Sequence, residues 1–230
     1  MNFISYINEV KNPDEILTNC SEYINTISHC SSKLYRGTKY NIRTWKKLKV
    51  RENRKPRDTG QYTHDRFDEK FEKRFGWPAR SESVMAVSHL GYASVYAEEA
   101  GGNVAIFLPT NGFKFIWSPK VEDFFVVVKN LWPGGRPENR SMPLNKFGLD
   151  MFRLDMITVL KAIDKKEYIK EINKAADSDE MSNIVADAIV ETYTNKHLCE
   201  AVNYKVEIMF ECDDYYLVNS YWSYTIGLGI

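Results

Sequence analysis

Hydrophobic residues recur along this chain with two different periods, one typical of helices and one typical of strands. Between residues 14 and 30 they return at every third or fourth position, which predicts an amphipathic helix. Phe67, Phe71 and Phe75 lie four residues apart and predict a second helix that ends at Gly76. The same period predicts further helices at 91–101 and at about 147–163, 165–176 and 179–195.

Short apolar or alternating runs between these segments predict strands. We expect strands at 33–38, 81–88, 103–109 and 112–119, with the last two joined by a hairpin-like turn at "TNG". Two or three more strands finish the chain, in 203–218 and 220–228. The order helix, strands, helices, strands predicts one α+β domain in which the late strands return to the early sheet.

The stretch "NYKVEIMFECDDYYLV" places a carboxylate at a position that the pattern alone leaves ambiguous. Its alternation puts Val206, Ile208 and Phe210 on one face of a strand. Glu207 therefore shares the opposite face with Met209. One interpretation is a solvated carboxylate on an edge strand, and the other is a catalytic carboxylate at the end of a strand.

The composition is that of a packed globular protein. The chain has 230 residues, of which 43% are hydrophobic and 13% aromatic. It contains no apolar run of the roughly 18–20 residues that a membrane span needs, and no signal peptide is recognisable. The cysteines and histidines are scattered, so we expect neither a disulfide framework nor a metal site. These features predict a reducing, cytoplasmic setting without membrane contact.

The charges are balanced overall but unevenly distributed. The segment from Lys33 to Arg57 contains eleven lysines and arginines and one acid, with Tyr35, Tyr40 and Trp45 between them. A basic segment interleaved with aromatic residues can bind phosphates or nucleic acid, although it can equally be a solvated surface loop. Within it, Arg54 or Arg57 can reach a phosphate.

Several short sequences follow one another in an order that carries a family resemblance. "LYRGT" at 34–38 is followed by "SVMAVS" at 83–88, a short helix with Ala93 and Tyr96, and "NVAIFLPTNGFKF"; "VEIMF" comes late in the chain. This order resembles the ADP-ribosyltransferase fold, in the branch defined by an arginine, a Ser-Thr-Ser strand and a glutamate. The middle of the chain is also similar to a group of phage and prophage proteins.

This resemblance implies a fold and a domain organisation. The expected fold is α+β, an ADP-ribosyltransferase-like split mixed β-sheet core with an N-terminal helix and a helical insertion. Residues 1–230 would form a single domain, with a helical N-terminal segment at 1–31 and the insertion at about 145–196.

The resemblance also implies an activity and its residues. It implies a mono-ADP-ribosyltransferase that uses NAD as substrate, with Glu207, Arg36 and Ser88 as the catalytic residues. A planar guanidinium suits the NAD phosphates, and a carboxylate suits the positive charge that develops on the ribose. With Arg57 added from the basic segment, the residues expected to bind NAD are Tyr35, Arg36, Gly37, Ser88 and Arg57. Tyr96 is expected to serve packing.

Two departures from the family pattern bear on the acceptor. Ala86 replaces the first serine of the Ser-Thr-Ser strand, and Lys205 stands where relatives carry Glu or Gln two residues before the catalytic glutamate. A lysine cannot accept a hydrogen bond from a guanidinium, which argues against an arginine acceptor. Lys205 and Arg54 are therefore predicted to contact the target, and nucleic acid, RNA in particular, is favoured over protein.

Three functions remain open from the sequence. The first is ADP-ribosyl transfer to a macromolecule in phage–host conflict, as a defence toxin or a phage effector. A toxin role would imply an antitoxin or chaperone partner. The second is a catalytically inactive module of the same fold that binds nucleic acid or protein. The third is an NAD glycohydrolase, in which water is the acceptor.

Overall fold

A seven-stranded antiparallel sheet forms the centre of the molecule. The computed structural model describes residues 13–56, 59–129, 131 and 146–225. Within them the strand order is β2-β7-β4-β1-β3-β6-β5, and every pairing is antiparallel. The strands are β1 (Tyr35–Thr38), β2 (Trp45–Lys49), β3 (Val84–Val87), β4 (Asn103–Pro109), β5 (Lys114–Trp117), β6 (Glu207–Glu211) and β7 (Asp214–Val218).

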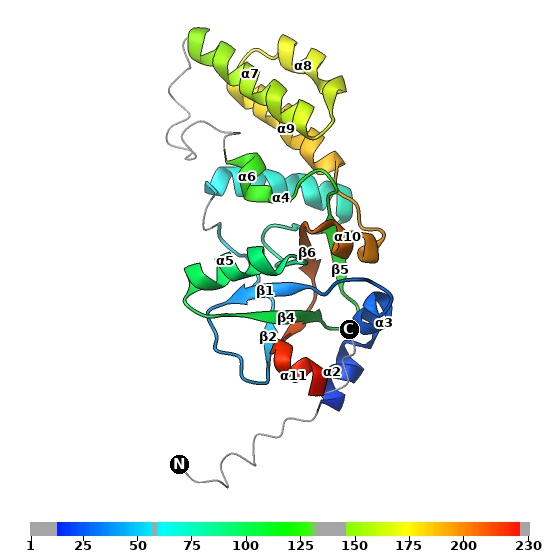
Figure 1. The fold of residues 1–230 in the computed structure, drawn as a ribbon. Helices are drawn as coiled ribbons and strands as arrows, with labels where there is room; N and C mark the ends of the chain where they lie inside the picture. The colour runs from blue at the N-terminus through cyan, green and yellow to red at the C-terminus, as the bar shows by residue number, and fades with distance from the viewer. Residues whose placement is uncertain (1–12, 57–58, 130, 132–145, 226–230) are drawn as a thin grey trace.

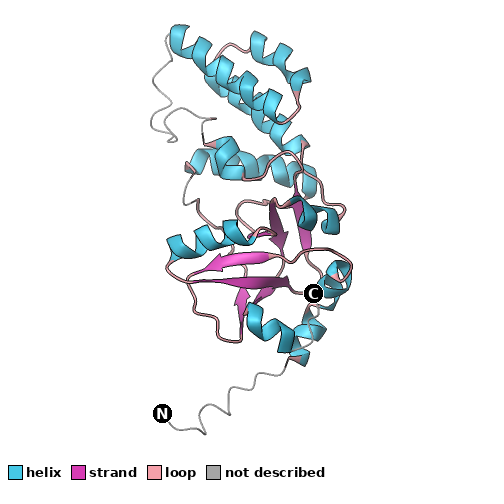
Figure 2. Ribbon diagram, in the orientation of Figure 1, coloured by secondary structure: helices cyan, strands magenta, loops and turns pink. Residues whose placement is uncertain are grey.

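Helices cover the sheet and extend beyond it (Figure 1). They are α2 (Asp14–Asn19), α3 (Ser21–Ile27), α4 (Gln61–Phe75), α5 (Leu90–Ala100), α6 (Phe124–Val128), α7 (Lys146–Ala162), the 3-10 helix η2 (Lys166–Tyr168), α8 (Ile169–Lys174), α9 (Ser178–Glu191), α10 (Leu198–Tyr204) and α11 (Ser220–Thr225). Figure 2 shows α7, α8 and α9 stacked above α4 and α6, which in turn lie above the sheet. In the described part of the chain, no helix is long and apolar enough to cross a membrane.

The predicted α+β class is confirmed, and so is the return of the late strands to the early sheet. β6 pairs with β3, and β7 pairs with β2 and β4. The expected mixed sheet is wrong for the described strands, because all of their pairings are antiparallel. The predicted ends of two helices are also confirmed: α4 and α5 stop at Gly76 and Gly101, which have φ angles of 83° and 69°. These left-handed conformations favour glycine.

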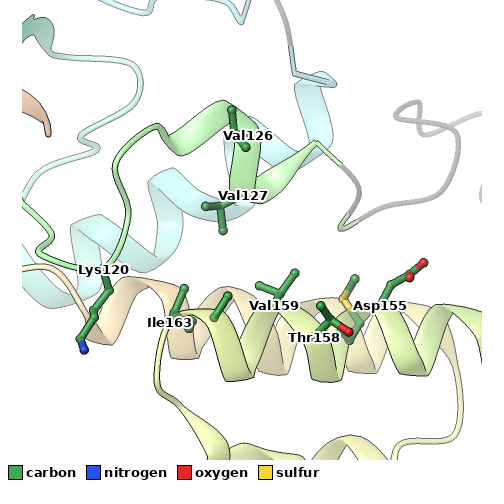
Figure 3. A pocket seen from close by; sticks show the side chains of 9 residues that line it. Lys120, Val126, Val127, Asp155, Thr158, Val159 and Ile163 are labelled. Carbon is green, nitrogen blue, oxygen red and sulfur yellow. The ribbon is translucent and has the colours of Figure 1, made fainter.

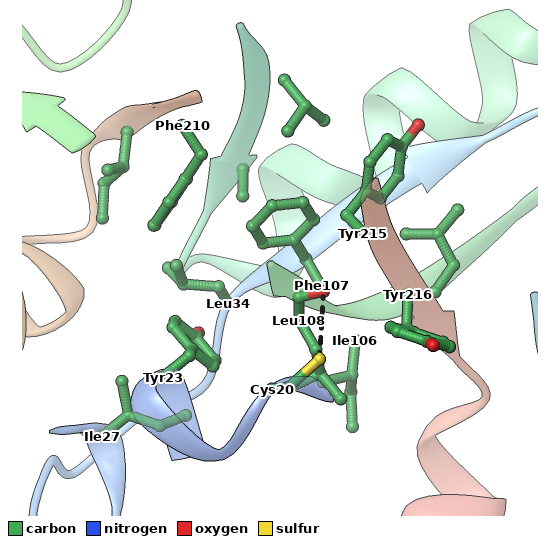
Figure 4. Close-up of a cluster of buried hydrophobic side chains, with 14 of the residues drawn as sticks. Cys20, Tyr23, Ile27, Leu34, Ile106, Phe107, Leu108, Phe210, Tyr215 and Tyr216 are labelled. Carbon is green, nitrogen blue, oxygen red and sulfur yellow. Dashed lines mark hydrogen bonds between the residues drawn. The ribbon is translucent and has the colours of Figure 1, made fainter. Parts of the chain in front are cut away.

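Two hydrophobic clusters lie on opposite faces of β5 and β6, and the first also includes consecutive residues of β4 and β7. The first cluster packs the N-terminal helices against the sheet, with Tyr23 edge-on to Phe210 at a ring-centroid distance of 6.3 Å (Figure 4). The second cluster packs α4, α6, α7 and α9 together and against the sheet. β6 contributes Ile208 and Phe210 to the first cluster and Met209 to the second. This confirms the predicted alternation and puts Glu207 on the face of the second cluster.

The predicted hairpin between 103–109 and 112–119 is wrong. β4 pairs with β1 and β7, whereas β5 pairs with β6 at the other side of the sheet. The turn between them is bound elsewhere, because the Asn111 backbone N–H donates to the carbonyl of Asn19 at 2.7 Å. The Asn111 side chain also donates to the carbonyl of Thr18 at 2.9 Å. Docking of this turn on α2 directs the chain away from a hairpin.

Two further segments differ from the prediction. Residues 220–225 form α11 rather than a strand, because the side chain of Asn219 accepts the backbone N–H groups of Tyr221 and Trp222 at 2.9 and 3.3 Å. This bond pattern is a helix N-cap. The basic segment, for which a solvated surface loop was one interpretation, contains the edge strand β2.

The described residues contain one disulfide bond, although the scattered cysteines predicted no disulfide framework. Cys30, just after α3, is bonded to Cys199 in α10, with a Cα–Cα distance of 5.3 Å and a sequence separation of 169 residues. Spacing could not reveal this pair, because it depends on how α3 packs against α10. Among the described residues, Cys20 and Cys212 are free.

Candidate active site

Glu207 is the first residue of β6 and is fixed on three sides. Its backbone N–H donates to the carbonyl of Glu122 at 3.0 Å, and the residue pairs with Val87 of β3. Its carboxylate accepts the backbone N–H of Phe124, the first residue of α6, at 3.4 Å. The side chain is half-buried. Glu207 is therefore held at a junction of the sheet and the helical layer.

The surroundings of Glu207 act on its ionisation in opposite directions. Burial raises the pKa of this carboxyl, and the negative charge of Asp123 raises it further. Arg80, the Phe124 amide and Arg54 lower the pKa, but burial outweighs them. Within the described chain, no basic side chain forms an ion pair with Glu207. Half-buried carboxyl groups with a perturbed pKa and charged neighbours are common in active sites.

Two arginines from different parts of the chain, Arg54 and Arg80, act on this carboxylate, and a third, Arg36, acts on Arg54. Arg36 of β1 donates from Nη1 to the carbonyl of Met85, and Arg80 places Nη1 3.8 Å from the Met85 sulfur. Arg54, in the loop after β2, has its pKa lowered to about 10 by burial and by the positive charges of Arg80 and Arg36. Arg54 and the unpredicted Arg80 therefore lie close enough to Glu207 to affect its ionisation, and Arg36 lies close enough to Arg54 to affect that of Arg54.

A buried hydrogen-bonded group on α4 fixes two of these arginines through their backbones. Asp68 accepts the N–H groups of Arg80 and Ser81 at 2.6 and 3.2 Å, and the Ser81 hydroxyl also donates to it. The Ser81 carbonyl accepts the N–H of Arg54 at 3.0 Å. His64, one turn before Asp68 on α4, lies 3.3 Å from the Asp68 carboxylate. Asp68 therefore orders both loops that carry Arg54 and Arg80.

The start of α6 contributes a second carboxylate. Asp123 caps this helix by accepting the N–H groups of Phe125 and Val126 at 2.8 and 3.3 Å. The Tyr96 hydroxyl of α5 donates to the same side chain at 3.3 Å. Tyr96 is 42% exposed. Its hydroxyl joins α5 to the start of α6, beside Glu207.

Ser88, Tyr35 and Gly37 occupy the strands around Glu207. Ser88 directly follows β3; it is 5% exposed, and its hydroxyl has no hydrogen-bond partner among the described residues. Tyr35 pairs with Val87, which pairs with Glu207. Gly37 was expected to bind NAD, and the close approach observed at its backbone is that of α5. A Cβ on Gly37 would lie 2.5 Å from the carbonyl oxygen of Ala93.

Two predicted residues remain, Lys205 and Arg57, and the structure describes only Lys205. Lys205 is exposed and ends α10 with a φ of 61°. Arg57 lies outside the described residues. The aromatic residues of the basic segment are already engaged: Lys46 lies 3.9 Å from the Tyr40 ring centre, and Trp45 is 8% exposed. These rings do not form an open stacking surface.

A cavity of about 350 Å³ lies away from this cluster, between α6 and α7 (Figure 3). Its lining is mainly apolar, with Val126 and Val127 on one side and Val159 and Ile163 on the other. Its charged lining residues are Lys120 and Asp155. The cavity offers shape and apolar surface, whereas the chemically active groups lie around Glu207. Within the described residues, no group of His, Cys, Asp and Glu side chains could hold a metal ion.

Sequence reasoning missed Arg80 and Asp123. A signal existed for Asp123, because an Asp before the apolar run "FFVVV" is typical of a helix N-cap. No local pattern separates Arg80 from a surface arginine, since its partners lie on α4, β3 and α6.

Comparison of the chain with protein-family models, curated proteins and solved structures gives no match. The geometry of the cluster therefore carries the functional argument. The guanidinium groups of Arg36 and Arg54 can bind a ligand that bears more than one negative charge. A fixed carboxylate beside them can stabilise a developing positive charge or accept hydrogen bonds from sugar hydroxyls. Together these groups suit cleavage of a glycosidic bond in a phosphorylated nucleotide.

Proposed function

We propose that the protein is an NAD-dependent mono-ADP-ribosyltransferase with a macromolecular acceptor. The observation that carries this proposal is one row of cross-strand pairs, Tyr35–Val87–Glu207, across the adjacent strands β1, β3 and β6. Arg36 follows the first residue of this row, and Ser88 follows the second. Arg36, Ser88 and Glu207, which are widely separated in sequence, thus lie in or directly after neighbouring strands of the sheet.

The chemistry of NAD fits the residues present. Its diphosphate would bind the guanidinium groups of Arg36 and Arg54, which supply planar pairs of donors. Cleavage of the bond between nicotinamide and the ribose C1′ leaves the electron pair on nicotinamide and a positive charge on the ribose. The ionised carboxylate of Glu207 would stabilise that charge, while the acceptor forms the new bond to C1′ and loses a proton.

The acceptor in this proposal is a nucleic acid, RNA in particular, rather than a protein. Lys205 is exposed two residues before Glu207, so it can meet an incoming phosphate backbone, whereas Arg54, predicted from the sequence to contact the target, is assigned here to the NAD diphosphate. Because the aromatic rings of the basic segment are engaged elsewhere, recognition would rest on charge more than on base stacking. The biological setting would be phage–host conflict, with an antitoxin or chaperone as a partner if the protein is a toxin.

The replacement of the first motif serine by Ala86 is the main argument for the inactive binding module. Ala86 is 1% exposed and belongs to the first hydrophobic cluster, on the face of the sheet away from Glu207. A side chain at this position packs in the core, so the replacement is compatible with an active enzyme.

Incubation with NAD labelled in its adenine half tests the proposal. RNA, DNA and a protein extract are offered in separate reactions, and released nicotinamide is quantified in each. Transfer of label to RNA supports the proposal as stated, and transfer to protein corrects its acceptor. Free labelled ADP-ribose without transfer indicates an NAD glycohydrolase. Absence of nicotinamide release with every acceptor overturns both enzymatic functions and leaves the binding module.

A further inference from the structure

Arg80 is a buried cation with few polar partners. Its residue is 7% exposed, and its Nε has no hydrogen-bond partner among the described residues. The guanidinium lies over the ring of Phe124, with Cζ 4.1 Å from the ring centre, and its Nη1 faces the sulfur of Met85 at 3.8 Å. Burial of a charged group whose neighbours are an aromatic ring and a thioether sulfur costs free energy. We therefore expect the charge of Arg80 to have a role in the site.

Phe124 connects this cation to Glu207. The ring of Phe124 lies under the Arg80 guanidinium, and the backbone N–H of the same residue donates to the Glu207 carboxylate at 3.4 Å. The two charged groups therefore share one neighbour without forming an ion pair with each other. This arrangement leaves the carboxylate available to a substrate while a positive charge stays close to it.

The position of Arg80 does not depend on Glu207. Its backbone N–H donates to Asp68 of α4, which is 7% exposed. Phe124 is 1% exposed and packs on Phe67 of α4, with ring centroids 4.7 Å apart. Because α4 fixes both the backbone of Arg80 and the ring beneath its side chain, the cation is in place before any ligand binds.

We propose that Arg80 is a positioning residue that keeps the carboxylate of Glu207 ionised and in place beside the reacting ribose. The proposal rests on the proposed function for its reaction, but not for the shared neighbour, Phe124, that connects the two residues. Other charged or titratable groups also act on Glu207, and the effect of Arg80 must be separated from theirs: Arg54, Asp123, Tyr96 and Tyr193.

Arg80→Met and Arg80→Lys separate the charge from the packing. Titration of the ¹³C-labelled Glu207 carboxyl, assigned with Glu207→Gln, should move to higher pH in Arg80→Met and return toward wild type in Arg80→Lys. Nicotinamide release by Arg80→Met should fall on the order of 10-fold in kcat, with KM for NAD little changed. The acidic limb of its pH–rate profile should move to higher pH.

A matched control removes a different partly buried arginine. Arg153 donates to the carbonyls of Ile172 and Ala175, where it supports the helical layer far from Glu207. Arg153→Met should leave the titration of Glu207 and the shape of the pH profile unchanged. If Arg80→Met does not fold, Phe124→Leu removes the supporting ring and keeps the backbone donor, and its Glu207 titration should also move upward.

The outcomes separate this inference from the proposed function. An unchanged titration of Glu207 in a folded Arg80→Met protein overturns the inference, and so does an increase in KM with kcat unchanged. For the Phe124→Leu protein, an unchanged titration has the same meaning. A shifted titration in a protein that releases no nicotinamide supports the link between Arg80 and Glu207 and overturns the NAD reaction instead.

Discussion

The two ends of β6 carry the same residue type in two different environments. Glu207 and Glu211 are four residues apart on one strand and therefore on the same face. Glu211 forms an ion pair with Lys114 of the neighbouring β5, at 2.7 Å and with both side chains partly exposed. Glu207 has no such partner among the described residues and accepts the longer hydrogen bond from the Phe124 amide.

The difference shows how position alone changes the role of a carboxylate. The ion pair at Glu211 is partly exposed, and such a pair ordinarily contributes about 0–1 kcal/mol to stability. This small structural contribution is enough to account for Glu211. At Glu207, burial raises the pKa, while the nearby arginines oppose that change without contacting the carboxylate. A carboxylate held in this way costs stability, and a ligand or transition state can offset the cost. Glu211 is thus the natural control for Glu207.

The largest effect is expected from removing the charge at the site end of β6. Glu207→Gln should lower nicotinamide release on the order of 100-fold, because a neutral amide cannot stabilise the charge on the ribose. Glu211→Gln should leave the rate within a few-fold of wild type. Steady-state assays of both variants measure the contrast. Equal rates in the two variants would remove the distinction between the two ends of the strand.

The second effect concerns the disulfide bond near the Glu207 end of β6. Cys199 lies in α10, which directly precedes β6, whereas the free Cys212 directly follows it. Cys30→Ser should lower the free energy of unfolding by about 2–4 kcal/mol, because the disulfide closes a long loop in the unfolded chain. Cys212→Ser should change it much less. Urea unfolding measures both, and a reductant should bring wild type to the level of Cys30→Ser.

A third contrast tests the guanidinium on β1. Arg36→Lys retains the charge but loses the planar pair of donors, so the KM for NAD should rise about 10-fold. Arg43→Lys, in the exposed part of the same basic segment, should not change KM. An equal rise in both variants would mean that the segment contributes only general charge.

The smallest effect is on stability and depends on pH. Because the folded-state pKa of Glu207 is raised, the unfolded chain releases this proton first as the pH rises. The native state therefore loses stability from about pH 4, where an unfolded glutamate titrates, up to the folded pKa. Glu207→Gln should be more stable than wild type above this window and equal to it below. Thermal unfolding of wild type and Glu207→Gln at several pH values tests this. If Glu207→Gln is less stable than wild type at neutral pH, the pKa of Glu207 is not raised by its surroundings.

The sequence predicted features that depend on near neighbours along the chain. The phenylalanine stripe of α4 and its end at Gly76 follow from local periodicity and local conformation. The alternation around Glu207 likewise gave the correct face of β6. These predictions hold because tertiary packing on an amphipathic helix or strand reinforces the local preference.

Features that depend on distant partners could not be predicted. The turn at Asn111 has a hairpin composition, but its hydrogen bonds to α2 direct β4 and β5 to different places in the sheet. The disulfide of Cys30 and the burial of Arg80 likewise depend on elements far away in sequence. The candidate site was therefore only partly predictable: Glu207, Arg36 and Arg54 came from motif and charge, and Arg80 came from packing alone.

The most direct test of the central claim is a crystal structure of Glu207→Gln with NAD bound, since this variant should bind the substrate and cleave it only slowly. The account predicts the diphosphate within about 3 Å of the guanidinium nitrogens of Arg36 and Arg54, and the nicotinamide ribose beside residue 207. NAD bound in the cavity between α6 and α7, or absent at millimolar concentration, would contradict it.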